Sequence, residues 1–441
     1  MSLPNHHPIF NLPPELLSKI FAHSTTNTYP SVIEAPINVS SVCKSWRQIA
    51  LSTPCLWSDV YIVQYTDCKR LPTARTIQAW ISRSGSYGFS FTISRIKVEE
   101  LDKTEFNAVI DVLLENCEMW RKVHITMQKN YSAELLSVLP MRTPNLRKLA
   151  IDGPKFAIAN LFDAPLTRLT HLFIIGTTIH SPPRGNLLLE NLVFIQLISV
   201  HHSDVVECLS RSPRLEDVRA YFDFTAEDSR RIQERVCFTL KHMQHLHLII
   251  TIHNCDEGQR GPFDHINFPT LKTLLFKLLV HDFETTHIRR DVLWDFSVNI
   301  ASRYGGSTQN LEIESQCYGL AHPGFIDRFR SLKHLGIHIS VLNNDCIRAL
   351  VSRFSSSTKP PFQTRSCLES LRIYGFNGDD HEPTLRTIID LAEKEKSSNA
   401  VRPVIIVPSD PIILSSDSTI EITNAHDWLE RRCDLYRDLD W

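Results

Sequence analysis

A short hydrophobic pattern recurs along most of this chain and limits its fold more than any other feature. Each copy has an apolar residue, two variable residues, a second apolar residue, one variable residue and a third apolar residue. The second apolar position occurs in steps of 23 residues and then of 28 residues, at positions 149, 172, 195, 218, 246 and 274. Such regularity predicts an array of stacked repeats, because one repeat cannot bury its own apolar face.

Nine copies are clear. Their apolar residues are Trp120/Val123/Ile125, Leu146/Leu149/Ile151, Leu169/Leu172/Ile174, Leu192/Ile195/Leu197, Leu215/Val218/Ala220, Met243/Leu246/Leu248, Leu271/Leu274/Phe276, Leu332/Leu335/Ile337 and Leu368/Leu371/Ile373. A degenerate copy contains Leu311 and Ile313. The alternation within each copy predicts a strand. Helical patterns between the strands, at 105–114, 204–209 and 345–351, favour a parallel sheet along one concave wall.

The N-terminal segment has a different pattern, typical of a small helical cluster. Pro13 and Pro14 suit the first turn of a helix, which we expect to end near His23. Pro36 begins a second expected helix, whose apolar stripe is Val39, Val42, Cys43, Trp46, Ile49 and Ala50. A break at 52–54 precedes a short turn with Leu56 and Trp57, and 59–63 is expected to be the first strand.

About fifty residues rarely bury enough surface to be stable alone. The remaining apolar surface of these helices must therefore cover the adjoining domain, a partner, or both. Three segments, 12–17 (LPPELL), 42–47 (VCKSWR) and 50–57 (ALSTPCLW), occur in order within residues 9–58. Together they resemble the F-box, most closely the F-box-like variant abundant in mushroom-forming fungi, and 80–86 (WISRSGS) resembles a segment of the same group. The loop between the first two helices is longer than in the common F-box.

The resemblance implies a partner, because F-boxes dock on the Skp-family adaptor of cullin-RING ubiquitin ligases. The adaptor-binding residues that it implies are Leu12, Pro13, Leu16, Ile20, Val42, Cys43 and Trp46. The last three would lie partly in the core of the module, and Leu56 and Trp57 would join the module to the next part of the chain. The chain would then be the substrate receptor of a Skp–cullin–F-box ligase and would carry out no catalysis itself.

The repeats resemble the irregular leucine-rich repeats of F-box proteins, since their period fits but the usual Asn or Cys is missing. We therefore expect an α/β fold, with a small helical F-box followed by a leucine-rich-repeat-like solenoid whose parallel sheet lies on the concave face. The expected divisions are 1–58 (F-box-like module), 59–114 (linker or first cap repeat), 115–410 (solenoid) and 411–441 (C-terminal cap or tail).

Two longer steps, from 274 to 311 and from 335 to 371, indicate insertions. The first contains an expected helix at 289–294, and the second contains a loop at 355–361. Residues 404–407 read as a last strand, and 427–438 as a capping helix or a loose tail.

Variable residues between the apolar positions point away from the core and could contact a target. These candidates are Lys148, His171, Phe173, Gln196, Asp217, Arg219, Tyr221, His245, His247, Lys277, Glu312, His334, His338, Arg372 and Tyr374. Aromatic residues and arginines are the natural anchors of an interface. The target-binding set chosen from them is His171, Phe173, Arg219, Tyr221, His247, Arg372 and Tyr374. A solvated strand surface remains the alternative interpretation.

The charge balance argues against nucleic acid and anionic membranes as partners. Lys and Arg number 47 and Asp and Glu 49, a net charge of -2. The 11 cysteines are scattered without a C-x-x-C pair, which favours free, mostly buried thiols in a reducing compartment. The N-terminus has no basic start or apolar core of a secretion signal, so the expected location is cytoplasmic, nuclear or both.

Motifs for nucleotide, metal or nucleophilic chemistry are missing, including G-x-x-x-x-G-K-[ST], H-E-x-x-H and G-x-S-x-G. Of His242, His245 and His247, only the last two share a strand face, and no metal site or cofactor is expected. Two alternatives stay open. The chain could be an interaction scaffold whose N-terminal helices only cap the solenoid, or an enzyme without a recognised motif.

Overall fold

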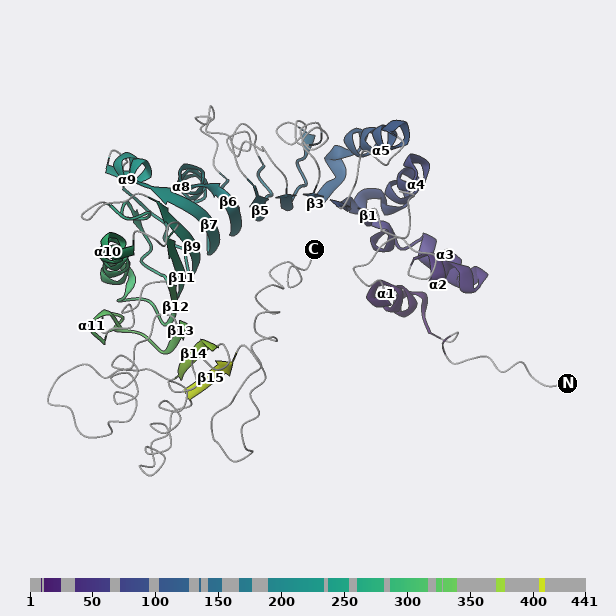
Figure 1. The fold of residues 1–441 in the computed structure, drawn as a ribbon. Coiled ribbons are helices and arrows are strands. Elements are labelled where there is room, and N and C mark those ends of the chain that lie inside the picture. Colours follow the sequence, from purple (N-terminus) through teal and green to yellow (C-terminus); the bar gives the residue numbers. More distant parts are fainter. Residues whose placement is uncertain are drawn as a thin grey trace, which may run out of the picture. The chain divides into compact units, whose positions relative to one another are not determined.

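The fold comes from a computed structural model and divides into two compact units, Met1–Leu192 and Val193–Asp440. Figure 1 draws the chain from the N-terminal helices to the last strand. The structure describes residues 9, 12–24, 36–63, 72–94, 103–126, 135, 142–152, 166–176, 189–233, 237–253, 260–280, 286–315, 323–326, 328–338, 370–376 and 404–408.

The first unit begins with helices, continues with strands separated by helices, and ends with three successive strands. Its elements are α1 (Pro14–Ser24), α2 (Ile37–Val42), α3 (Lys44–Leu51), the 3-10 turn η2 (Pro54–Trp57), β1 (Asp59–Val63), α4 (Ala74–Ser84), η3 (Gly85–Tyr87), β2 (Phe89–Ser94), α5 (Lys103–Glu115), η5 (Cys117–Met119), β3 (Trp120–Thr126), β4 (Lys148–Asp152) and β5 (His171–Ile175). The strands pair in chain order, all parallel. The segment 59–114 therefore contributes two strands to the sheet that contains β3.

The expected single helix from Pro36 is wrong. The chain breaks at Cys43, whose backbone is extended (φ -156°, ψ 172°), so that α2 and α3 are separate helices. The Cys43 sulfur then accepts a hydrogen bond from the Trp46 N–H at 3.5 Å and caps α3. Because of this break, Val42 leaves the apolar stripe and becomes 57% exposed.

The second unit also combines strands with helices. Its elements are β6 (Phe194–His201), α8 (His202–Arg211), β7 (Asp217–Thr225), α9 (Ala226–Gln233), β8 (Phe238–Thr239), β9 (His245–His253), β10 (Ile266–Asn267), β11 (Thr273–Val280), α10 (Thr286–Tyr304), β12 (Asn310–Ser315), α11 (Pro323–Ile326), β13 (His334–His338), β14 (Ser370–Phe376) and β15 (Val404–Pro408). The main sheet has the order β6-β7-β9-β11-β12-β13-β14-β15, and β8 pairs with β10 separately. All the pairings are parallel.

The strand register confirms the sequence pattern. Equivalent apolar positions of successive copies are paired directly, which places like residues side by side. In the first unit the second apolar positions align as Val123, Leu149 and Leu172. In the second unit they align as Ile195, Val218, Leu246, Leu274, Leu311, Leu335 and Leu371. The predicted strands, including the degenerate copy and the last strand at 404–407, are therefore all present.

A turn of one kind precedes most of these strands. The N–H of the first apolar residue donates to the carbonyl three residues earlier. Examples are Leu146 to Thr143 at 3.2 Å, Leu169 to Leu166 at 3.0 Å, Leu192 to Leu189 at 3.1 Å and Leu271 to Phe268 at 3.3 Å. The residue that follows the first apolar residue uses its carbonyl to bind the next copy. The carbonyl of Lys272, which follows Leu271, accepts hydrogen bonds from the N–H groups of both Gln309 and Asn310. The turns thus extend the hydrogen-bond ladder beyond the strands.

Among the described elements, the helices of each unit that lie between strands pack on one face of the sheet, and no described helix covers the other, open face (Figure 1). Along β7 the side chains of Val218, Ala220, Phe222 and Phe224 are buried beside α8 and α9, whereas the alternating residues are more accessible. Helices were predicted at 105–114, 204–209 and 289–294, and α5, α8 and α10 confirm them. The predictions for 345–351, 355–361 and 427–438 lie outside the described residues.

Among the helices that the structure describes, none is both long and apolar enough to cross a membrane. Five cysteines are described, and all five are free thiols. Cys117 and Cys208 are buried as expected, but Cys237 is exposed, so burial of the thiols is not general.

The aligned apolar rows predict a large loss of stability when one is interrupted. Leu246 is 1% exposed and lies between Val218 and Leu274 on its two neighbouring strands. Leu246→Ala should lower the free energy of unfolding by about 2–5 kcal/mol, because the neighbours cannot close the cavity. Ile249→Ala, on the half-buried opposite face of β9, should cost less than half as much. Urea unfolding measures both, and equal losses would contradict the assignment of the buried face.

Candidate functional site

The core of the N-terminal helices is built from one side of α1. Leu17 and Phe21, one helical turn apart, are 3% and 1% exposed. The Phe21 ring lies 4.9 Å from the Trp46 ring of α3, centroid to centroid. The indole N–H of Trp57 donates to the Ala50 carbonyl at 2.8 Å and fixes η2 against α3. These contacts bury one face of α1.

The adjoining side of α1, about 100° around the helix axis from Leu17 and Phe21, stays apolar and exposed. Leu16 and Ile20, again one turn apart, are 46% and 44% exposed. Across the residues that the structure describes, five large hydrophobic side chains are exposed, and the other three are Val42, Leu51 and Tyr87. Four of the five therefore belong to α1, α2 and α3. Single exposed apolar residues are common, but such concentration in one small segment indicates a contact surface.

The remaining predicted adaptor-binding residues are Leu12, Pro13, Cys43 and Trp46, and they differ in exposure. Pro13 is exposed, and its carbonyl accepts the N–H groups of Leu16 and Leu17 at 3.0 and 3.1 Å. Leu12, Cys43 and Trp46 are half-buried. Cys43 and Trp46 thus serve the fold through the α3 cap and the contact with Phe21, and only part of each is open to a partner.

The helical cluster is joined firmly to the neighbouring strands. The Trp57 ring packs edge-on against Trp80 of α4 at 5.1 Å, and the Arg83 guanidinium lies 4.3 Å above the Trp57 ring. The Ser90 N–H of β2 donates to the Ser58 carbonyl at 2.6 Å. Leu56 and Trp57 are both buried, in agreement with their expected role as the joint.

A comparison with protein-family models matches residues 9–63 to the family described as F-box-like. This segment is an F-box-like domain. It ends at the last residue of β1, so it contains α1, α2, α3 and η2, with all four of their exposed apolar side chains. F-box domains are typically adaptor or receptor modules that bind Skp-type proteins and are not catalytic. A search of curated proteins found no match.

The open faces of the strands carry the predicted target-binding residues. His171, Arg219, Tyr221, His247 and Arg372 are half-buried there. The accessibility predicted for Phe173 and Gln196 is wrong, since they are only 5% and 3% exposed. Tyr374 lies in β14, but its side chain is outside the described part of the structure.

Side chains that can carry opposite charge lie in pairs on the open face of the second unit, some within one strand and some across neighbouring strands. Arg219 lies 3.5 Å from Asp217 and also covers the Phe194 ring at 5.1 Å. His253 lies 3.3 Å from Asp223, and Lys277 pairs with Glu314. Strand pairing also places the carboxylate of Asp217 next to His245. The sequence close to His245 contains no carboxylate and therefore does not reveal this neighbour. Burial raises the Asp217 pKa, against the opposing effects of Arg219 and His245.

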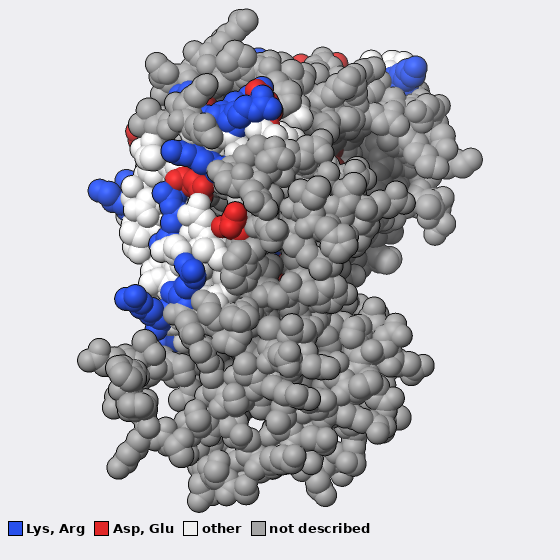
Figure 2. Space-filling model, turned by 60° about the vertical axis from the view of Figure 1, so that its left-hand side comes forward, with Lys and Arg blue, Asp and Glu red and all other residues white. Residues whose placement is uncertain are grey.

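The face shown in Figure 2 also has mixed charge, with Lys and Arg side chains in a band interrupted by acidic side chains. The first unit differs, because the register aligns Lys122, Lys148 and His171 on three adjacent strands. Burial, reinforced by Lys148 and Lys122, lowers the His171 pKa to about 4. The ring is therefore neutral at physiological pH.

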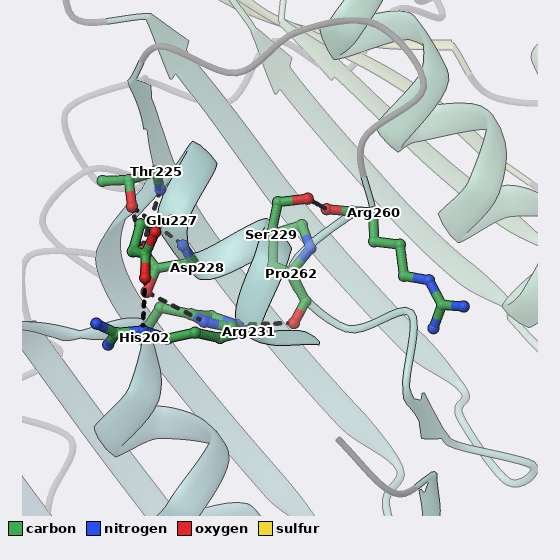
Figure 3. Close-up of polar contacts among 8 residues, drawn as sticks. All are labelled: His202, Thr225, Glu227, Asp228, Ser229, Arg231, Arg260 and Pro262. Carbon is green, nitrogen blue, oxygen red and sulfur yellow. Dashed lines mark hydrogen bonds and ion pairs between the residues drawn. The ribbon is translucent and has the colours of Figure 1, made fainter. Parts of the chain in front are cut away.

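A second polar cluster lies in the second unit and was missed by sequence reasoning (Figure 3). His202 is 3% exposed, and its Nε2 is 2.8 Å from the Pro262 carbonyl, while Nδ1 is 3.9 Å from Asp228. Asp228 accepts the Thr225 hydroxyl at 2.7 Å, and the Ser229 hydroxyl donates to the Arg260 carbonyl at 2.9 Å.

The residue types of this cluster suggest a Ser–His–Asp triad, but its bonds do not form one. The Ser229 hydroxyl is directed to a backbone carbonyl, and the imidazole Nε2 is held by another. The His202 ring also packs edge-on against Phe224 at 5.0 Å. The cluster therefore fixes α8, α9 and the 260–262 segment to one another. Among the described residues, no group of three or more His, Cys, Asp or Glu side chains could hold a metal ion.

His171 gives a pH-dependent prediction with a definite sign. Its pKa is about 4 in the folded chain and near its ordinary value of 6.5 when unfolded, so the unfolded chain binds more protons between these values. Stability should fall as pH drops from 6.5 towards 4. His171→Gln should reduce this loss. Urea midpoints at several pH values test this, and an unaltered slope in His171→Gln would contradict it.

Proposed function

We propose that this chain is the substrate-recognition subunit of a Skp–cullin–F-box type ubiquitin ligase. The observation that carries the proposal is the concentration of exposed large apolar side chains in the one segment that matches the F-box-like family. The core of that segment is already complete, with Leu17, Phe21 and Trp57 buried, so Leu16, Ile20 and Val42 are not needed to close it. A Skp-family adaptor is the partner that would cover them.

Within the adaptor contact, the residues have different roles. Leu16, Ile20 and Val42 are the anchors, since each would bury a large apolar side chain on docking. Leu12 and Pro13 form the edge of the contact at the start of α1. Cys43 and Trp46 support it, because they fix the orientation of α3 relative to α1.

The rest of the chain would hold the protein target. The parallel strands, the in-register apolar rows and the repeated turn support irregular leucine-rich repeats arranged as a solenoid. Its open face offers His171, Arg219, Tyr221, His247 and Arg372 as target contacts, and Tyr374 of β14 is a further member of the predicted set. Phe173 is buried and is not proposed as a contact. The chain would act by proximity in the cytoplasm or nucleus, raising the concentration of the target near the ubiquitin-conjugating enzyme.

Co-expression with a Skp-type adaptor tests the docking role. Leu16→Glu and Ile20→Glu should each weaken adaptor binding about thirty-fold or more, because a charge would replace an apolar anchor. Both side chains are more than two-fifths exposed, so the chain should still fold. The matched control is Tyr87→Glu, which alters an equally exposed side chain (47%) outside residues 9–63. Equal adaptor binding by all three variants would reject the proposal.

Truncation separates the ligase receptor from a scaffold whose N-terminal helices only cap the repeats. The contact of Trp57 with Trp80 favours some capping contribution. Removing residues 1–58 should therefore lower the unfolding midpoint, but the Leu16→Glu variant should keep the wild-type midpoint while losing the adaptor. Loss of repeat stability without any measurable adaptor binding by the full chain would favour the scaffold.

A further inference from the structure

The first unit contains a pocket of about 680 Å³ beside the amino ends of its strands. Three arginines line it: Arg121 at the start of β3, Arg147 directly before β4 and Arg168 in the turn before β5. They come from three successive copies of the repeat, so the repeat spacing brings them together. None of the exposed apolar residues of the F-box-like domain lines the pocket.

The pocket has an unbalanced positive charge. Its lining residues include the three arginines and no Asp or Glu. Among the described residues, no ion pair joins any of these guanidinium groups to a carboxylate. This differs from the neighbouring unit, where Arg211, Arg219 and Lys277 each have an acidic partner. Three like charges in one concavity repel each other, and a bound anion would relieve the repulsion.

Two of the arginines are positioned by specific contacts. The Arg121 guanidinium lies 4.3 Å above the Tyr87 ring. The aliphatic part of the Arg121 side chain passes close to Gly88. A Cβ atom added at Gly88 would lie 3.1 Å from Arg121 Cδ and 2.7 Å from the Met119 carbonyl oxygen. Gly88 has φ +77°, so glycine suits this position for its backbone and for its small size.

Arg168 is held by an amide relay. Its Nη1 donates to Asn145 Oδ1 at 2.7 Å, and Asn145 Nδ2 donates to the Glu118 carbonyl at 2.9 Å. The hydrogen bond to Asn145 uses one of the five N–H donors of the Arg168 guanidinium. Arg147 and Arg168 are exposed, so their other donors can reach a ligand.

The chemistry of the lining identifies the ligand class. Planar guanidinium forks match the oxygens of phosphate groups, and several of them together favour a dianion over a single carboxylate. Tyr87 and Met119 add an apolar wall, and the volume exceeds that of one phosphate. We propose that this pocket binds the phosphate monoester group of an organic ligand, either a phosphorylated side chain or a free phosphorylated small molecule. Such binding would not depend on adaptor docking.

Isothermal titration of the full chain tests the pocket with defined probes. These are N-acetyl-O-phosphotyrosine amide, glucose 6-phosphate, their unphosphorylated counterparts and inorganic phosphate. At least one monoester should bind more tightly than inorganic phosphate, and its unphosphorylated counterpart should not bind. Affinity should fall as salt increases. Preference for the phosphotyrosine probe assigns a phosphorylated side chain, and preference for glucose 6-phosphate assigns a small molecule.

Variants locate the binding. Arg147→Gln and Arg168→Gln should each weaken it about ten-fold or more, through loss of charged hydrogen bonds. Gly88→Ala should also weaken it, by displacing Arg121. The control is Arg214→Gln, because Arg214 directly precedes Leu215 as Arg168 precedes Leu169, but lies in the other unit. Unchanged far-UV circular dichroism and adaptor binding show that the variants fold.

Two results would overturn the inference. One is that neither monoester binds more tightly than its unphosphorylated counterpart or than inorganic phosphate. The other is that the Arg147 and Arg168 variants bind a monoester as the Arg214 control does.

Discussion

The structure depends on the direct pairing of equivalent apolar residues across parallel strands. Leu246 between Val218 and Leu274 is one example, and the same alignment recurs through each unit. A copy by itself would expose this row, so each copy is stable only with a neighbour on its side. The hydrogen bonds of the turns before the strands hold this register, which fixes the face on which every variable residue lies.

The F-box-like domain buries only part of its apolar surface within the chain. Its helices form a core of Leu17, Phe21 and Trp57 and attach to α4 through Trp80, but they leave Leu16 and Ile20 uncovered. Apolar side chains within the strands are covered by the next copy, whereas these two have no such cover in the described structure. This difference links the physical chemistry of the domain to its proposed role in docking a separate subunit.

Charge is distributed unequally between the two units. In the second, the open face is organised as pairs, with Arg219 beside Asp217 and Lys277 beside Glu314. In the first, Lys122, Lys148 and His171 share one row, and three arginines share one pocket. The net charge of -2 reveals neither the charge row nor the arginine pocket, because it does not depend on which charged residues the fold brings together.

Hydrophobic periodicity and proline positions act over a few residues, so they were enough to predict most strands of the main sheets and the helices α1, α5, α8 and α10, but not β2, α4 or α9. The F-box-like segment was predicted from the resemblance of three short motifs to that family. The three-dimensional fold was needed to show that Cys43 breaks a helix, that Phe173 and Gln196 are buried, and that Asp217 lies beside His245. It was also needed to bring together Arg121, Arg147 and Arg168, which are more than twenty residues apart in turn. Contacts of this kind depend on strand pairing and side-chain packing between distant segments, and local periodicity carries no information about them.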